Sequence, residues 1–381
     1  MPLQDKLRED GQKRLLAIDG GGIRGVLSLE VLKRIENLLQ TQSGRGTAFR
    51  LSDYFDYIAG TSTGGIVAAG LSIGMSVDEI MRFYVEAGAQ MFVKANLLMR
   101  LRSKFEDEPL ALELKKVFGA DTTLGSDKLR TLLLLIMRNA TTDSPWPISN
   151  NPYAKYNEPT RSDCNLKLPL WHLVRASTAA PTYFPPEVVM VGGHQFVFVD
   201  GGVTMYNNPA FQMVLMATVD RYWPRAPAGQ RGWPTGTERM LVVSVGTGTS
   251  PDVRDGLEPG EMNLLFNAAT IPSALMFAAL NEQDFLCRTF GNCLAGDPLD
   301  REVGDMIAAA GPASPKLFTY LRYNAELTEG GLAALGCGRV APDAVRKLDA
   351  VDAIPALREV GRAVAEKKVE ADHFARFPVT A

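Results

Sequence analysis

Residues 15–25 read LLAIDGGGIRG: four apolar residues, an aspartate, three glycines and the start of a new segment. A short apolar run that ends in a glycine-rich turn is typical of a buried strand in a parallel sheet. Beyond the turn, through residues 24–40, apolar side chains recur at steps of three and four, the spacing of one helix face. This part of the chain therefore predicts a strand, a tight turn and a helix.

The same order returns further along the chain. Residues 54–59 (YFDYIA) predict a second strand, GTSTG follows at 60–64, and small residues at 64–69 continue as a helix. Further short strands are expected at 132–137, 196–199 and 241–245, with helices at 170–180 and 209–220, whereas residues 140–169 show neither period and predict a long surface loop. Because strands that alternate with helices need crossover connections, we expect an α/β fold with a mostly parallel central sheet and helices on both faces.

The length of the chain bounds its domain organisation. The 381 residues correspond to two or three domains at about 150 residues each, although single α/β enzyme domains often exceed that length. After residue 250 helical segments dominate, at 262–290 and 355–374, with one strand-like piece at 316–323. We expect a core of residues 13–250 and a mainly helical C-terminal extension, residues 251–381, packed on the same domain.

The charge balance excludes a nucleic-acid polymer as the partner. Lys and Arg number 40 against 43 Asp and Glu, a formal net charge of −3, whereas nucleic-acid-binding proteins carry a basic surplus. The four cysteines include no CxxC pair and accompany only three histidines, so we expect reduced thiols and no zinc site. No stretch approaches the roughly 18 apolar residues of a membrane span, and the first residues show no signal-peptide pattern. We therefore expect a cytoplasmic protein, at most peripheral at the inner membrane surface.

The segment GTSTG at 60–64 matches GxSxG between a predicted strand and a predicted helix, which is the context of a nucleophile elbow. Gly60 and Gly64 leave room for the serine, because neighbouring Cβ atoms would collide in such a turn. The start of the helix would stabilise developing negative charge. Ser62 is therefore a candidate nucleophile, and the alternative is a tight strand-to-helix turn without chemistry.

The glycine turn after the first strand has three interpretations. Gly20, Gly22 and Gly25 match the GxGxxG of a dinucleotide site, but that site needs an acidic residue at the end of a second strand about 20 residues later, where this chain is still helical. In the second interpretation, N–H groups of Gly20, Gly21 and Gly22 form an oxyanion hole, and Arg24 adds positive charge or locks the loop. The third is a turn without a ligand.

Asp200, Gly201 and Gly202 directly follow the strand at 196–199. Because parallel strands place their carboxyl ends at one sheet edge, we expect Asp200 to meet Ser62, although 138 residues separate them. A partly desolvated aspartate with a raised pKa can take the proton of a serine. The order Ser62, Asp200, His373 also matches an α/β-hydrolase triad, which stays as an alternative although the elbow comes early and an HGGG-type motif is missing.

The ordered set DGGGIRG, GTSTG, STAAP (177–181) and DGG resembles the patatin-like phospholipase family over residues 15–248. The resemblance implies a three-layer α/β/α fold and a serine lipid acyl hydrolase that cleaves ester bonds of glycerophospholipids through an acyl-enzyme, without metal or organic cofactor. Carried over to this chain, Ser62 and Asp200 are the catalytic dyad, with no histidine. The oxyanion loop is Gly20, Gly21, Gly22 and Arg24, and the supporting motif glycines are Gly60, Gly64, Gly201 and Gly202.

The partners follow from the same resemblance. It implies a phospholipid or another lipid at a membrane surface as the substrate. Some bacterial members are effectors that attack membranes once a cyclic oligonucleotide binds, so such an activator and a homo-oligomer are further expectations, although no motif demonstrates them. In residues 96–109 apolar and basic side chains interleave, which fits either a segment at a lipid surface or a helix that covers the core.

Overall fold

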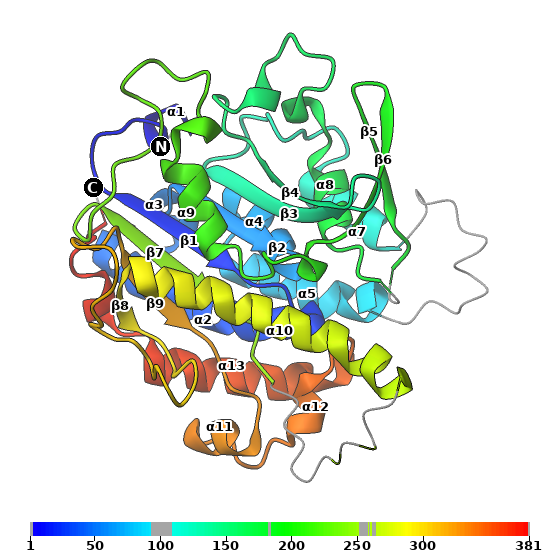
Figure 1. Cartoon of the computed structure of the whole chain (residues 1–381), viewed down its shortest axis with the longest axis vertical. Helices are drawn as coiled ribbons and strands as arrows, with labels where there is room; N and C mark the ends of the chain where they lie inside the picture. Colours follow the sequence, from blue (N-terminus) through cyan, green and yellow to red (C-terminus); the bar gives the residue numbers. More distant parts are fainter. Residues whose placement is uncertain are drawn as a thin grey trace.

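The computed structural model describes residues 3–92, 109–181, 184–250, 258, 260 and 264–379. Its strands are β1 (Lys13–Ile18), β2 (Tyr57–Thr61), β3 (Leu132–Asn139), β4 (Ser144–Ser149), β5 (Glu187–Val191), β6 (His194–Asp200), β7 (Met240–Val245), β8 (Asn292–Ala295) and β9 (Thr319–Tyr323). They form one sheet in the order β5-β6-β3-β2-β1-β7-β9-β8, with β4 also paired to β3 (Figure 1). The neighbouring strands β3, β2, β1, β7, β9 and β8 all pair in parallel. Strands β4 and β6 pair antiparallel with β3, and β5 pairs antiparallel with β6. The mostly parallel sheet of an α/β fold is thus confirmed.

Helices cover both faces of this sheet. They are α1 (Leu3–Lys6), α2 (Gly25–Ser43), α3 (Leu51–Tyr54), α4 (Thr63–Ser72), α5 (Val77–Phe92), α7 (Pro109–Phe118), α8 (Leu170–Ser177), α9 (Ala210–Thr218), α10 (Leu264–Phe290), α11 (Glu329–Ala334), α12 (Pro342–Arg346) and α13 (Ile354–Lys368). On one face α2, α4 and α8 contact the sheet and α13 packs on α2, while α9 and α10 lie on the other (Figure 1). This arrangement is the expected three-layer architecture.

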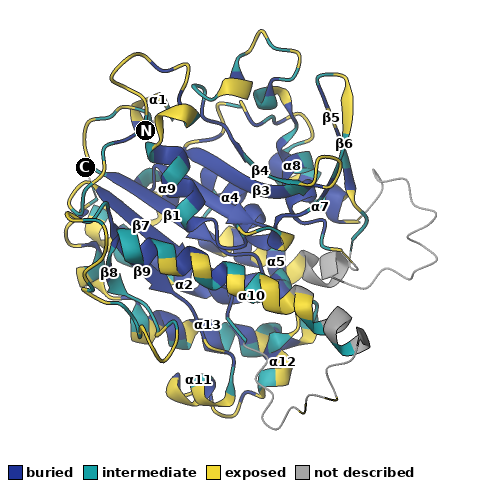
Figure 2. Cartoon of the chain, viewed as in Figure 1, coloured by how far each residue is buried: buried dark blue, intermediate teal, exposed yellow. Residues whose placement is uncertain are grey.

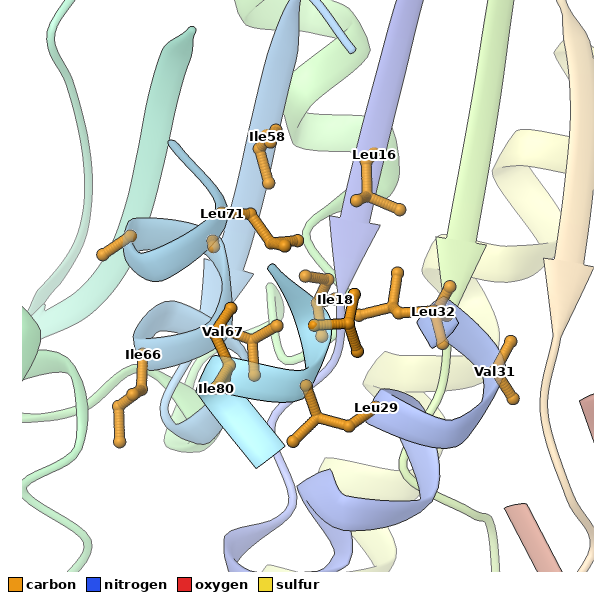
Figure 3. Packing of buried hydrophobic residues seen from close by; sticks show 14 of the residues in the cluster. Leu16, Ile18, Leu29, Val31, Leu32, Ile58, Ile66, Val67, Leu71 and Ile80 are labelled. Carbon is orange, nitrogen blue, oxygen red and sulfur yellow. The ribbon is translucent and has the colours of Figure 1, made fainter. Parts of the chain in front are cut away.

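The alternating side chains of β1 explain why its sequence is apolar at every position. Leu16 and Ile18 belong to the hydrophobic cluster on one face, and Figure 3 shows Ile18 between Val67 of α4 and Leu32 of α2. Leu15 belongs to the cluster on the opposite face, under α9 and α10. The central strands are accordingly buried along their length (Figure 2). A strand covered on both sides produces a continuous apolar run, as the sequence indicated.

Some predictions of local structure are wrong. Residues 140–169 were expected to form one loop, but β4 lies within them, and the strand expected from residue 54 begins only at Tyr57. The sequence of β4 is SPWPIS, whose two prolines hide the alternation of a strand and suit an edge position. Strands β5 and β8 were not expected, and β5 turns into β6 through Gly192 and Gly193, whose φ angles of 59° and 83° favour glycine.

The residues after 250 contribute more than helices. Strand β9 pairs with β7 on one side and with β8 on the other, so this part of the chain supplies two strands of the central sheet. Among the described helices, none combines the length and the apolarity that crossing a bilayer demands. The four cysteines are buried and unpaired, and the described residues contain no cluster of three or more metal-ligating side chains. The segment 96–109 lies outside the described residues, apart from Pro109 at the start of α7.

Candidate active site

Ser62 occupies the sharp turn between β2 and α4. Its φ of 55° and ψ of −125° lie in a region that side-chain-bearing residues rarely adopt. The turn depends on the two flanking glycines. A Cβ on Gly60 would lie 2.0 Å from the carbonyl oxygen of Gly64, and a Cβ on Gly64 would lie 2.3 Å from that of Ile18. The sequence GTSTG therefore forms the strained strand-to-helix elbow that its pattern predicted.

A second serine holds this elbow in place. The N–H of Ser62 donates to Ser177 Oγ at 2.9 Å, and the Ser177 hydroxyl donates to the carbonyl oxygen of Ile136 at 2.5 Å. Ser177 is fully buried at the end of α8. It links the helix to the turn and to β3. The sequence placed Ser177 in the STAAP motif but did not reveal this contact, because 115 residues separate the two serines.

The carboxylate expected beside Ser62 is there. Ser62 Oγ donates to Asp200 Oδ2 at 2.6 Å, and the N–H of Gly202 donates to Asp200 Oδ1 at 2.6 Å. A Cβ on Gly201 would lie 2.3 Å from the carbonyl oxygen of Ile136, so the DGG turn lies directly against β3.

The reason for this meeting differs from the one expected, because β6 is antiparallel to β3. Strand β4 pairs along residues 134–139 of β3. The other edge of β3 is shared, with β2 paired to residues 132–136 and β6 to residues 137–139. The two strands therefore approach each other end to end, one finishing at Thr61 and the other at Asp200. The prediction that Asp200 lies at the end of a parallel strand is wrong, although the neighbour it predicted is right.

The environment of Asp200 makes its carboxyl group harder to ionise than an aspartate in water. Burial raises the pKa of Asp200 to about 6, while the hydrogen bonds from Ser62 and Gly202 and the charge of Arg175 act in the opposite direction. The residue is 4% exposed and Ser62 is 8% exposed. A carboxyl with a pKa near 6 is deprotonated at neutral pH, yet it is more basic than an aspartate in water. It is therefore suited to accept the serine proton.

The glycine loop lies against the nucleophile. A Cβ on Gly20 would lie 3.2 Å from the Cβ of Ser62 and 2.3 Å from Asn207 Oδ1, so only glycine fits. The Gly20 N–H, which was expected to face an oxyanion, instead donates to the carbonyl oxygen of Asn207 at 3.1 Å. The N–H groups of Gly21 and Gly22 have no hydrogen-bond partner in the described part of the chain. These two amides are therefore the ones available for an oxyanion.

The other faces of the loop are filled by the chain itself. A Cβ on Gly21 would lie 2.1 Å from Thr247 Oγ1, and one on Gly22 would lie 2.2 Å from the carbonyl oxygen of Leu348. Only glycine fits at either position, and β2 is followed by Ser62 rather than by an acidic residue. The dinucleotide alternative is not supported.

Asp19 precedes the three glycines of the loop and Arg24 follows them closely, and both side chains are charged. Arg24 Nε is buried without a hydrogen-bond partner among the described residues, and burial lowers its pKa to about 10, against the opposing charge of Asp19. Asp19 accepts hydrogen bonds from Arg322 at 3.0 and 2.6 Å. Arg322 also donates to Ser244 Oγ at 2.7 Å. The loop is thus anchored to β9, a contact across 303 residues that no sequence pattern indicated.

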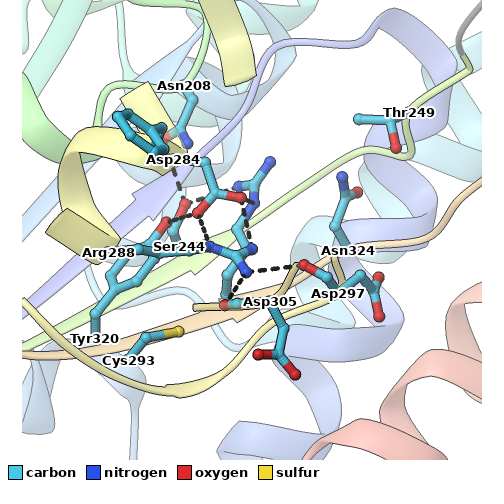
Figure 4. A network of polar contacts seen from close by, with 12 residues as sticks. Asn208, Ser244, Thr249, Asp284, Arg288, Cys293, Asp297, Asp305, Tyr320 and Asn324 are labelled. Carbon is cyan, nitrogen blue, oxygen red and sulfur yellow. Dashed lines mark hydrogen bonds and ion pairs between the residues drawn. The ribbon is translucent and has the colours of Figure 1, made fainter. Parts of the chain in front are cut away.

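This anchor continues into a buried polar network (Figure 4). Asp284 of α10 accepts hydrogen bonds from Arg288 at 2.9 and 2.8 Å and from the Tyr320 hydroxyl at 3.0 Å. Arg322 Nε lies 3.7 Å from Asp284 Oδ2. The network therefore ties α10 and β9 to the base of the glycine loop.

None of the three histidines, all of which are described, bonds to the dyad. His172 Nε2 lies 2.8 Å from Glu187 Oε1, His373 Nδ1 shares a hydrogen bond of 2.8 Å with the Tyr323 hydroxyl, and His194 is exposed. The Ser-Asp-His triad that would use His373 is therefore not supported.

Comparisons with known proteins find related sequences and structures. The model of the family described as patatin-like phospholipase matches residues 16–214. Patatin-17 of Solanum cardiophyllum is 30% identical over 250 residues, which cover 62% of this chain and 61% of that protein. Patatin-like protein 1 of Arabidopsis thaliana is 28% identical over 324 residues, 74% of this chain and 75% of that one. The chain thus spans about three fifths of the length of Patatin-17. Among solved structures, human GIVD cytosolic phospholipase A2 is similar with a TM-score of 0.40 and 11% identity, over 96% of this chain and 65% of that one.

Proposed function

Since the chain belongs to the patatin-like phospholipase family, we propose that it hydrolyses ester bonds of glycerophospholipids or related acyl lipids, with Ser62 as the nucleophile and Asp200 as its base. The observation that carries this proposal is the 2.6 Å hydrogen bond from Ser62 Oγ to Asp200 Oδ2 at a strained elbow. The glycine loop supports it, because Gly20 lies against Ser62 and the N–H groups of Gly21 and Gly22 have no hydrogen-bond partner among the described residues.

The reaction begins with attack on the ester. Asp200 takes the proton of Ser62 as Oγ bonds to the carbonyl carbon, and the carbonyl electrons move to oxygen. The N–H groups of Gly21 and Gly22 donate to this oxyanion, and Arg24 adds positive charge beside the loop. Such donors typically stabilise the transition state by ~3 kcal/mol each. Collapse of the intermediate breaks the ester bond, and the leaving alcohol takes the proton from Asp200.

The second half of the reaction repeats the same roles. Asp200 takes a proton from water while the water oxygen attacks the acyl carbon of the acyl-enzyme. Collapse restores the Ser62 hydroxyl, with the proton returned from Asp200, and releases the fatty acid. Each step uses only groups of this chain and water, so the proposal includes no metal or organic cofactor.

Product analysis tests the proposed function. Vesicles of a mixed phospholipid extract are incubated with the wild type and with Ser62→Ala, and mass spectrometry follows fatty acids and lysophospholipids. We expect both products only with the wild type, and covalent labelling of Ser62 by a fluorophosphonate probe. Equal release by both proteins would refute the assignment.

Regulation and location complete the proposal. We expect a cytoplasmic protein that works peripherally at the inner membrane surface. We also propose a cyclic oligonucleotide as its activator, as in some bacterial members of the family. The vesicle assay with and without cyclic dinucleotides tests the activator. Unchanged activity would refute the proposed activation by a cyclic oligonucleotide.

A further inference from the structure

A long part of α10 carries no charge. Residues 264–281, two thirds of the helix, include no Asp, Glu, Lys, Arg or His. Two of its large apolar side chains are nevertheless exposed, Ile271 by 49% and Leu275 by 65%. The exposed face of a helix in a water-soluble protein is normally rich in charged side chains. Exposed apolar side chains on an uncharged helix segment therefore indicate a surface that meets something other than water.

This segment lies at the same end of the molecule as Ser62. Asp284 of α10 reaches Arg322, near the carboxyl end of β9, and Arg322 holds Asp19 at the carboxyl end of β1. The helix then leads into β8, which runs parallel to β9, so its earlier residues lie further toward the carboxyl edge of the sheet. At 1.5 Å per residue, Leu275 and Ile271 lie about 14 and 20 Å along the helix from Asp284. Figure 1 shows the first turns of α10 projecting beyond the ends of the parallel strands.

Two other elements expose apolar side chains at this edge. Val203 and Met205 lie in the segment between β6 and α9, three and five residues after Asp200, and both are exposed. The segment is fixed at the site, because Thr61 Oγ1 donates to the carbonyl oxygen of Tyr206 at 2.6 Å.

In α5, the exposed Val85 follows Tyr84, whose hydroxyl donates to the carbonyl oxygen of Thr63 at 2.9 Å. We call these five exposed side chains the apolar rim: Val85, Val203, Met205, Ile271 and Leu275. They come from three elements, two of which hydrogen-bond to residues adjacent to Ser62.

We propose that the apolar rim seats the protein on a lipid surface, so that the edge of the sheet carrying Ser62 faces the bilayer. This inference rests on the proposed function, because a lipid ester that resides in a bilayer must reach Ser62 from this edge. Apolar side chains without neighbouring charge on the helix enter the boundary between head groups and acyl chains. A second copy of the chain on the same residues would lie across the approach to Ser62, which is why lipid is the occupant that the arrangement favours.

A pair of charged substitutions tests the rim. The variant is I271E/L275E, and the matched control is M190E/V219E, which places two glutamates on exposed apolar positions of the β5–β6 hairpin and of the far end of α9. Vesicles of phosphatidylcholine are used because they carry no net charge that would repel the added glutamates. Binding is measured by co-sedimentation with vesicles, hydrolysis by fatty-acid release, and basal activity with the soluble ester p-nitrophenyl butyrate.

We expect I271E/L275E to lose at least about tenfold in vesicle binding and vesicle hydrolysis, since each apolar side chain left in water forfeits its burial. Its activity on the soluble ester should stay within about twofold of the wild type, because exposed substitutions away from the site disturb the fold little. The control should match the wild type in all three assays. The neutral variant I271S/L275S should show the same pattern and keeps the test valid if the glutamates disturb folding.

Vesicle binding by I271E/L275E equal to that of the wild type would overturn the proposal. So would a dimer in light scattering that this variant turns into a monomer without loss of vesicle binding, because the rim would then join two copies. Failure of the proposed function is a separate outcome, in which the wild type hydrolyses neither ester. Co-sedimentation of Ser62→Ala and its I271E/L275E derivative measures the rim without any hydrolysis.

Discussion

At the scale of single residues, the chemistry depends on the carboxyl group of Asp200, which burial makes harder to ionise. Asp200 is held by one hydroxyl and one amide and is almost completely buried. Its pKa is raised to about 6, mainly by the loss of water around the charge. Only the deprotonated form can accept the proton of Ser62. The acid limb of the pH profile therefore reports directly on this residue.

We predict that kcat/KM for p-nitrophenyl butyrate falls as the pH is lowered through about 6, with half of the maximal value near that pH. The sign follows because protonated Asp200 cannot act as a base. Initial rates between pH 4.5 and 8 measure it. A profile that stays flat down to pH 4.5 would contradict the assignment of the base.

The same carboxyl group should destabilise the folded protein at neutral pH. Its pKa is higher in the folded chain than in the unfolded one, so the folded state binds more protons between about pH 4 and 6 and loses stability as the pH rises through that range. Above pH 6 the raised pKa of Asp200 lowers the free energy of unfolding by up to about 3 kcal/mol. Asp200→Asn should therefore unfold at a higher temperature than the wild type at pH 8, and the difference should shrink toward pH 4. Calorimetry at both values tests this, and a lower Tm for the variant at pH 8 would contradict it.

Much of the site could be predicted at this scale, because the demands are local. Ser62 and its flanking glycines follow from the steric limits of a five-residue turn, and Asp200 stands at the end of an apolar strand pattern. Ser177 and Arg322 could not be predicted, since a serine in a helix and an arginine in a strand are common, and only the fold brings them to the elbow and the glycine loop. The commitment of the Gly20 amide to Asn207 depends on the same long-range packing.

At the scale of elements, α8 acts on the nucleophile through one hydroxyl group. Ser177 accepts the N–H of Ser62 and donates to β3, so it fixes the strained turn from behind without touching the reacting atoms. We predict that Ser177→Ala lowers kcat by about 10- to 100-fold with a smaller change in KM, because the positioning of Oγ, rather than substrate binding, is lost.

A buried hydroxyl elsewhere provides the control for Ser177. Ser72 in α4 accepts a hydrogen bond of 2.9 Å from Thr131, away from the dyad. Ser72→Ala should lower Tm by a similar amount and leave kcat unchanged. If both variants lose activity in proportion to stability, Ser177 has only a structural role.

Burial on both faces decides which strands can be recognised in the sequence. β1, β2, β3 and β7 are covered on both faces, and their continuous apolar runs identify them. β4, β5 and β8 lie toward the margins of the sheet, where prolines, polar residues and short lengths remove the pattern. The direction of β6 could not be deduced from its sequence, because strand direction depends on pairing with β3.

At the scale of the whole molecule, the part after residue 250 is built into the core. β9 lies in the sheet beside β7, and α13 packs on α2, where Arg358 Nε donates to Glu30 Oε1 at 2.6 Å. We propose that the chain folds as one unit, with the extension as an integral part of it.

A chain that ends at Thr249 should therefore fail to fold. Its truncation exposes the edge of β7 and the outer face of α2, both apolar, and such edges aggregate. We predict insoluble protein from the shortened chain and a single cooperative unfolding transition for the full chain. A soluble, cooperatively folded chain of residues 1–249 would contradict this view of the extension.

The central claim is that Asp200, and no imidazole, activates Ser62. The most direct measurement compares hydrolysis of p-nitrophenyl butyrate by H172N/H194N/H373N, which leaves the chain without histidine, with hydrolysis by Asp200→Asn. We predict that the histidine-free protein keeps its kcat within about threefold and that Asp200→Asn loses about 10²- to 10⁴-fold. A folded histidine-free protein without activity, or an Asp200→Asn variant with wild-type activity, would contradict the dyad.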